Sequence, residues 1–203
     1  MKVVDTRSKS QFLQSLNIAI TEKLPKVEAE DLKRFADDFF LSAFVGEFEG
    51  RRVSDVLGLL VSARKFIQQY DGQEAKIAIF DPNLEEHGWQ STHTTLMIMQ
   101  QNMPFIVDSL RMTLASREIK AHTIQYASFQ TDRDSKGKLK TFKAHKHKAH
   151  DVLSGEGLVF LEVDRHTDED SKQALKDSIC AVLNDVAVTV NDYPAMQDKT
   201  KQI

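Results

Sequence analysis

The stretch QNMPFIVDSLRMTL, residues 101–114, combines a proline, an asparagine two places before it and a following apolar run at helical spacing. Asparagine is a common helix cap, and proline suits the first helical turn because its missing N–H would be unpaired there anyway. The pattern predicts a helix whose first turn contains Pro104, with free backbone N–H groups at its start. Such a helix end carries partial positive charge and can hold a carboxylate.

A second group of chemically capable residues lies in the basic segment 133–151, which holds seven Lys or Arg residues and two Asp residues. Imidazole and carboxylate groups there could ligate zinc or nickel. The candidate ligands are His145, His147, His150 and Asp151. Lysines lie between these histidines and would repel a dication, so the pattern favours an exposed hairpin end over a metal site. Only Phe142 interrupts the lysines, which argues against a nucleic-acid-binding surface.

A third candidate is the loop around Glu85, Glu86 and His87, whose side chains could supply an acid and a base. Side chains of adjacent residues diverge in space, so a solvated turn explains the three residues better than a catalytic group. Trp89, the only tryptophan, is expected to anchor this loop on the core rather than stack on a ligand.

The fingerprints of several enzyme classes are missing from the sequence. The only close glycine pair is Gly155 and Gly157, which precedes a strand-like run and lacks the third glycine of a dinucleotide-binding turn. No P-loop, Ser-x-x-Lys nucleophile, His-Glu-x-x-His helix or calcium loop is present, and a single cysteine excludes an internal disulfide. We therefore expect neither a catalytic site nor a cofactor in these 203 residues.

Composition indicates a folded protein, with 41% hydrophobic residues and a net charge of −3. No apolar run reaches the about 18 residues that a membrane helix needs, and the first residues are too polar for a secretory signal. These features predict a cytoplasmic protein without a membrane or nucleic-acid partner.

The spacing of apolar residues changes at residue 72, from a helical period to a mixture of strand-like and helical runs. The first part shows three amphipathic helices that end near Pro25, Gly46 and the Asp71–Gly72 turn, which predicts a small helical bundle over residues 1–72. The second part, residues 73–203, alternates strand-like and helical runs. The expected strands are 75–80, 92–100, 119–130, 139–145 and 157–164, with helices after the second strand and at the end.

The last helix is predicted to run to about Pro194, because apolar residues recur every three or four positions despite many β-branched side chains. We expect strand 139–145 to be the hairpin partner of strand 119–130. The order ββαβββα predicts an α+β fold, a ferredoxin-like antiparallel sheet with helices on one face.

Residues 79–118 read IFDPNLEEHGWQSTHTTLMIMQQNMPFIVDSLRMTLASRE. This segment resembles the N-terminal region of the large bacterial NAD-specific glutamate dehydrogenases, where an FxPxxEEHGW segment, a strand and a DDMPFLVDS-like helix start follow in this order. The segments GLVFLEVDRHTDED and LNDVAVTVNDYPAM are similar to the next strand and helix of that family. The similarity spans about residues 75–196, whereas the basic histidine hairpin departs from the family pattern.

The resemblance implies that residues 73–203 are an ACT-like domain in a much longer polypeptide. The parent enzyme would oxidatively deaminate L-glutamate to 2-oxoglutarate and ammonia with NAD, at a catalytic portion far toward its C-terminus. This fragment would have a regulatory and assembly role without a cofactor of its own. Its implied partners are other domains of the polypeptide, a homo-oligomer and an amino-acid effector.

The resemblance also gives the helix start a possible ligand. Amino-acid-sensing ACT modules have a D-x-P-G-L-L pattern at the turn from their first strand into their first helix. The corresponding residues, and the candidate effector-binding site, are Gln101, Asn102, Met103, Pro104 and Phe105. Phe105 replaces the glycine, and its ring is expected to fill the space that a ligand would take. A purely structural role for the turn therefore stays open.

Two other functions are compatible with an isolated ferredoxin-like domain. A free-standing amino-acid sensor would bind an amino acid saturably, and an RNA-binding module would bind with steep salt dependence. RNA binding is the less favoured of these two functions, because the predicted strands lack the aromatic pair that RNA-binding modules of this fold use to stack bases.

Overall fold

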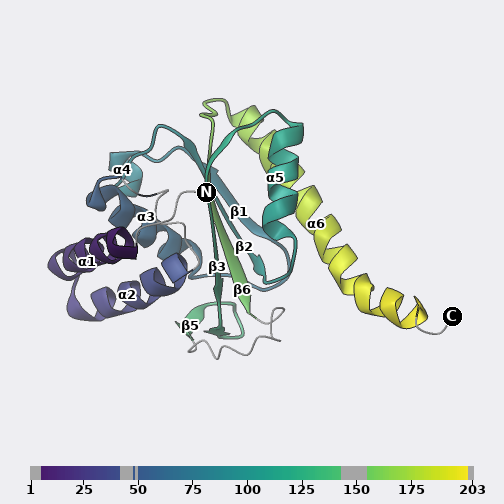
Figure 1. The fold of residues 1–203 in the computed structure, drawn as a ribbon, viewed down its shortest axis with the longest axis horizontal. Helices are drawn as coiled ribbons and strands as arrows, with labels where there is room; N and C mark the ends of the chain where they lie inside the picture. The colour runs from purple at the N-terminus through teal and green to yellow at the C-terminus, as the bar shows by residue number, and fades with distance from the viewer. Residues whose placement is uncertain (1–5, 42–47, 49, 143–154, 201–203) are drawn as a thin grey trace.

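The computed structural model describes residues 6–41, 48, 50–142 and 155–200, and all statements below concern these residues (Figure 1). Six helices are present: α1 Thr6–Lys23, α2 Lys26–Leu41, α3 Val53–Phe66, α4 Leu84–His87, α5 Ile106–Ser116 and α6 Glu169–Thr200. Six strands are present: β1 Lys76–Phe80, β2 Thr94–Gln101, β3 Ala121–Phe129, β4 Thr131–Arg133, β5 Leu139–Phe142 and β6 Glu156–Val163. No helix in this described part is long and apolar enough to cross a membrane.

Four strands form an antiparallel sheet in the order β1-β2-β6-β3. The central strands are β2, which reads TTLMIMQQ, and β6, which reads EGLVFLEV. Every residue of these two strands is buried except the last residue of β2, Gln101. Helix α5 connects β2 to β3, and β6 lies between these two strands. This split β-α-β arrangement is the ferredoxin-like pattern, so the α+β fold class expected from the sequence is confirmed.

One face of the sheet packs against α5 and α6 (Figure 1). Even-numbered positions of β2 such as Leu96 and Ile98 point to this face and meet the buried stripe of α5, Leu110 and Leu114. Helix α6 contributes Leu175, Ile179 and Leu183. The expected single long helix is thus confirmed, although it continues beyond Pro194 to Thr200. Its second half extends past the sheet (Figure 1).

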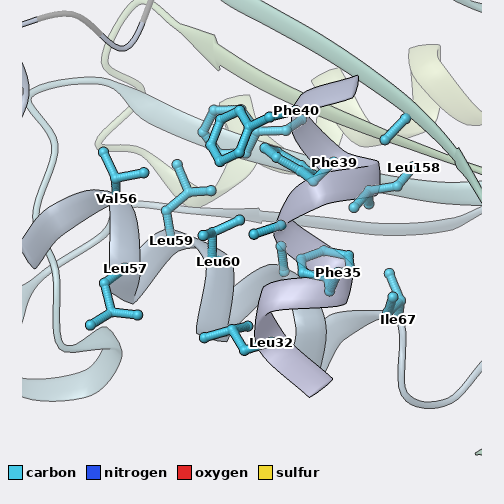
Figure 2. Close-up of a cluster of buried hydrophobic side chains, with 14 of the residues drawn as sticks. Leu32, Phe35, Phe39, Phe40, Val56, Leu57, Leu59, Leu60, Ile67 and Leu158 are labelled. Carbon is cyan, nitrogen blue, oxygen red and sulfur yellow. The ribbon is translucent and has the colours of Figure 1, made fainter. Parts of the chain in front are cut away.

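The opposite face of the sheet is covered by α1, α2 and α3 (Figure 1). Phenylalanines of α2 interlock with the sheet, and the ring of Phe35 stacks on that of Phe129 with centroids 5.4 Å apart. Figure 2 shows Phe35, Phe39 and Phe40 directed towards the leucines of α3. The sequence predicted the helical bundle, but it did not predict that the bundle would share its core with the sheet.

The strand expected at 139–145 pairs differently from the prediction. Strand β5 pairs with the short strand β4 in a separate two-stranded sheet, whereas β3 pairs with β6. The reason is burial: every residue of β6 is buried, so β6 takes the central position, while β5 is half exposed and stays at the periphery.

Leu110 provides a direct test of the α5 packing, because its side chain is fully buried against the sheet. Leu110→Ala should lower the free energy of unfolding by about 2 to 5 kcal/mol through lost burial and the cavity left behind. Urea unfolding measures the change, with the exposed neighbour Arg111→Ala as the control. A loss below about 0.5 kcal/mol for Leu110→Ala would show that this face is not core.

Candidate functional site

The predicted effector turn connects β2 to α5. The backbone N–H of Asn102 donates to the carbonyl of Gly155 at 2.9 Å, which ties the turn to the start of β6. Gln101 is exposed, Asn102 and Pro104 are half-buried, and Met103 packs against the core under α5. The structure therefore places the five predicted residues as one continuous turn at the end of the sheet.

Helix α5 begins at Ile106, two residues after Pro104, so the predicted place of this proline in the first helical turn is wrong. The cause is Phe105, which occupies the N-cap position with φ 69° and ψ 0°. This left-handed conformation is costly for a residue with a side chain and is natural for glycine.

The ring of Phe105 is 64% exposed. Its side chain therefore projects from the turn instead of packing into the core, and the expectation that the ring fills the space that a ligand would take stays a prediction. A strained backbone that displays a large apolar side chain is typical of functional sites. The α5 N-terminus has no side-chain cap at Phe105, so its first N–H groups are not satisfied in that way.

The side chain of Asn102 has a partner within the protein. The Tyr126 hydroxyl donates to Asn102 Oδ1, and burial raises the pKa of Tyr126 to about 12, which keeps the phenol neutral and able to donate. The side chain of Asn102 thus links the turn to β3.

Gln100 is a neighbour of the turn that the sequence did not single out. Its side chain lies on the sheet face covered by α5 and α6 and is 4% exposed. Its Nε2 is buried and has no hydrogen-bond partner among the described residues. Such an orphaned donor is uncommon in a folded protein. The only signal in the sequence is that Gln100 falls on the same face of β2 as Leu96 and Ile98.

A second polar cluster lies at the other end of the sheet. Glu162 of β6 is fully buried, accepts hydrogen bonds from both terminal nitrogens of Arg51, and also accepts from Ser91 Oγ at 2.8 Å. Burial alone would raise the pKa of this carboxyl, but the hydrogen bonds and charge of Arg51 outweigh burial and lower it. Arg51 also donates to Thr123 Oγ1 at 3.0 Å. Glu162 is therefore a paired carboxylate rather than a free acid or base.

Beside this cluster the rings of His93 and His122 lie with centroids 4.0 Å apart, and His122 Nε2 is 2.8 Å from Asp164 Oδ1. The pKa of His93 is lowered, chiefly by burial and then by the neighbouring His122. These residues were not predicted, because they come from segments far apart in the sequence.

Comparison with known families identifies the chain. Residues 35–179 match the sequence model of the "Glutamate dehydrogenase, ACT1 domain" family. The chain belongs to this family. It is also 34% identical over 196 residues to an NAD-specific glutamate dehydrogenase of Pseudomonas aeruginosa, and 30% identical over 201 residues to one of Halomonas elongata. These alignments cover 97% and 99% of this chain but 12% of each relative. No solved structure matches it significantly.

The remaining candidates behave as structural parts of this ACT1-family chain. Glu85 and Glu86 are exposed in the single turn of α4, which Asn83 caps by accepting from the Glu86 N–H at 2.8 Å. The ring of His87 stacks on Phe80 with centroids 4.7 Å apart. The expected anchoring role of Trp89 is confirmed, since its side chain is buried and Nε1 donates to Ser62 Oγ at 3.0 Å.

The candidate metal ligands His145, His147 and His150 lie outside the described residues. Within residues 6–41, 48, 50–142 and 155–200, no group of three His, Cys, Asp or Glu side chains is arranged to hold a metal ion.

Proposed function

We propose that this chain is a non-catalytic regulatory and assembly domain of a large NAD-dependent glutamate dehydrogenase. The observation that carries the proposal is its match to an ACT1 domain, together with its coverage of only 12% of relatives named NAD-specific glutamate dehydrogenase. The parent polypeptide would convert L-glutamate, NAD and water to 2-oxoglutarate, ammonia and NADH. Neither relative's name supports a free-standing sensor or an RNA-binding module.

The state of two carboxylates, one buried and one half-buried, supports a non-catalytic role. Glu162 is held by Arg51, and Asp81 accepts from Thr94 Oγ1 at 2.6 Å and pairs with Lys172 at 2.9 Å. A general acid or base works best when its pKa lies near the working pH. These two carboxylates instead have pKa values below their ordinary range, because hydrogen bonds and cations outweigh burial.

The regulatory part of the proposal assigns effector binding to Gln101–Phe105. Three features support it: an N-cap residue, Phe105, whose own side chain makes no cap hydrogen bond, the left-handed backbone and high exposure of this residue, and the orphaned amide of Gln100 on the strand that leads into the turn. An amino-acid carboxylate is the anion that such a helix end would hold.

The assembly part rests on the two edges of the four-stranded sheet, β1 and β3. An edge strand offers free backbone groups that pair with another strand, from a second copy or from another domain of the polypeptide. We propose that residues 73–203 form the ACT-like unit and that residues 1–72 form a helical leader packed on it. The parent enzyme would act in the cytoplasm as a homo-oligomer.

The full-length enzyme tests the proposal through its response to amino acids. Phe105→Gly keeps the left-handed turn accessible and removes the ring. In assays of NAD reduction by glutamate, this variant should change the amino-acid concentration for half-maximal response by about threefold or more, which is a coupling change of at least about 0.7 kcal/mol. Analytical ultracentrifugation should be run in parallel to follow assembly.

Two results would contradict the regulatory role. One is an unchanged amino-acid response together with an unchanged oligomeric state in Phe105→Gly. The other is a fall in turnover by orders of magnitude in the absence of any amino acid, which would place catalytic groups in this domain.

A further inference from the structure

Two histidines meet at the end of the sheet that lies opposite the effector turn. His93 directly precedes β2 and His122 is the second residue of β3, and these two strands lie on either side of β6. The ring centroids are 4.0 Å apart, and the ring planes are inclined by 35°. The two imidazoles therefore join the segment before β2, which we call loop 88–93, to β3. We refer to this contact as the histidine pair.

A β-bulge directs His122 towards His93. The residues on the two sides of His122 pair with adjacent residues of β6, so His122 is the extra residue in β3. A bulge turns a side chain out of the regular alternation of a strand, and bulges are common beside functional sites. The rest of β3 pairs with β6 without a register shift. The irregularity is thus confined to the residue that reaches His93.

The histidine pair is one of several contacts that hold loop 88–93. The hydroxyl of Ser91 donates to the buried Glu162 at 2.8 Å and accepts from the backbone N–H of His93 at 3.2 Å. The carbonyl of Ser91 accepts from Arg165 at 3.0 Å. Because the buried Trp89 anchors the start of this loop on α3, the histidine pair fastens its other end.

The two rings differ in their hydrogen-bond partners. His122 Nε2 is 2.8 Å from Asp164 Oδ1, and this hydrogen bond lowers the pKa of Asp164. His93 Nδ1 lies 3.4 Å from the Thr92 hydroxyl. An ionised carboxylate favours a charged neighbour of opposite sign. A first proton is therefore best placed on His122, and a second proton has to be placed on His93.

The surroundings oppose that second proton. Arg51 acts on His93 but is already paired with Glu162. On the side of His122, Arg111 of α5 lines a cavity of about 250 Å³ together with this histidine, and Lys120 lies near Asp164. Among these charged groups, cations outnumber carboxylates. Two imidazolium rings in contact would repel each other, and little negative charge is left to offset the repulsion.

We propose that the histidine pair is an acid-sensitive latch, which holds the end of loop 88–93 on β3 while at most one ring is protonated and releases it when both are protonated. The direction follows from the native pKa of His93, which burial and then His122 lower. The contribution of the pair to stability is complete above the unfolded pKa of about 6.5 and is lost as pH falls below that value. This device lies away from the turn at Gln101–Phe105 and goes beyond the proposed function.

Amide hydrogen exchange of the 203-residue chain tests the latch. Exchange is measured at about pH 7.5 and about pH 5 and corrected for the intrinsic rate at each pH. The amides from Trp89 to Thr95 should lose protection by about tenfold or more at the lower pH. Helix α2 should change by less than about twofold, which excludes unfolding of the whole domain.

Three variants show whether the effect belongs to the pair. His93→Gln and His122→Gln each leave one imidazole, so the loss of protection between the two pH values should shrink to about twofold or less. His87→Gln is the matched control, because its ring stacks on Phe80 with centroids 4.7 Å apart and has no part in the latch. This control should keep the full pH dependence of the native protein.

Nuclear magnetic resonance of the histidine ring protons gives a second readout that needs no variant to fold. In the native protein the two rings should titrate in two steps that are separated by about one pH unit or more. In His122→Gln, where this variant folds, His93 should take up its proton at a higher pH than in the native protein.

Three outcomes would overturn the latch: single-step titration of both rings near about pH 6.5, protection of loop 88–93 that does not depend on pH, or the same pH dependence in His122→Gln as in the native protein. None of them bears on an amino-acid response that arises at Gln101–Phe105. Failure of this inference would therefore leave the proposed function standing.

Discussion

Replacement of Arg51 by Met should destabilise the protein by about 3 to 5 kcal/mol at neutral pH, the cost of removing one partner from a buried ion pair. Glu162 is fully buried, and Arg51 supplies its only cationic partner within the described residues. Methionine keeps most of the length and packing of the arginine stem while removing the guanidinium. The carboxylate would then be left with the hydroxyls of Ser91 and Thr123 as side-chain donors.

The pH dependence of this loss has a definite sign. In the native protein Arg51 holds the pKa of Glu162 below its ordinary value, so the pair's contribution is present above the unfolded pKa of about 4.3 and is lost as pH falls through the folded pKa. In Arg51→Met, burial acts without a cation and raises the pKa of Glu162. The loss of unfolding free energy in the variant is therefore largest at neutral pH, and it becomes smaller as the carboxyl group of Glu162 takes up a proton.

Urea unfolding at about pH 7 and about pH 5 measures both effects. The difference in unfolding free energy between the native protein and Arg51→Met should narrow at the lower pH. Arg52→Met is the matched control, because the Arg52 side chain is 61% exposed in its pair with Asp55 and its loss should cost at most about 1 kcal/mol. Equal losses for the two variants, or a difference independent of pH, would show that Glu162 is not an ionised buried partner.

The backbone architecture could be predicted because its signals are local. The apolar stripe of α6 recurs every three or four residues along its first half, and the runs that form β2 and β6 are apolar enough to require central positions in the sheet. Resemblance to a family added the ACT-like assignment. The position of the bundle was not predictable in the same way, because an amphipathic helix does not specify which face of a sheet it will cover.

The functional sites were less predictable because their residues meet only after folding. Arg51 and Glu162 are 111 positions apart, and neither belongs to a spacing pattern. Phe105 was identified at the turn, but a left-handed conformation at a phenylalanine has no sequence signal, since its side chain disfavours that conformation. The sequence therefore located the turn and missed its backbone geometry.

Trp89→Ala should lower the free energy of unfolding by about 3 to 5 kcal/mol, because a fully buried indole leaves a large cavity. The indole N–H also donates to Ser62, whose hydroxyl would lose that partner. Thermal or urea unfolding measures the change. A loss below about 1 kcal/mol would indicate that the loop after α4 is not anchored on α3 through this residue.

Gly58 explains why the indole fits so closely against α3. A Cβ added at Gly58 would lie 2.6 Å from the Trp89 Cβ and 3.0 Å from its Cδ1, which is closer than real contacts permit. Gly58→Ala should therefore destabilise the native protein by about 1 to 3 kcal/mol through overpacking, despite the gain of about 1 kcal/mol in helix propensity.

The cost of Gly58→Ala should shrink in the Trp89→Ala background. There the ring atoms 3.0 Å away are gone, whereas the Cβ of residue 89 remains, so part of the overpacking is relieved and the gain of about 1 kcal/mol in helix propensity offsets more of the rest. A double-mutant cycle measures the coupling between the two positions, which should exceed about 1 kcal/mol. If Gly58→Ala costs the same in both backgrounds, the contact with Trp89 is not what requires glycine in the middle of α3.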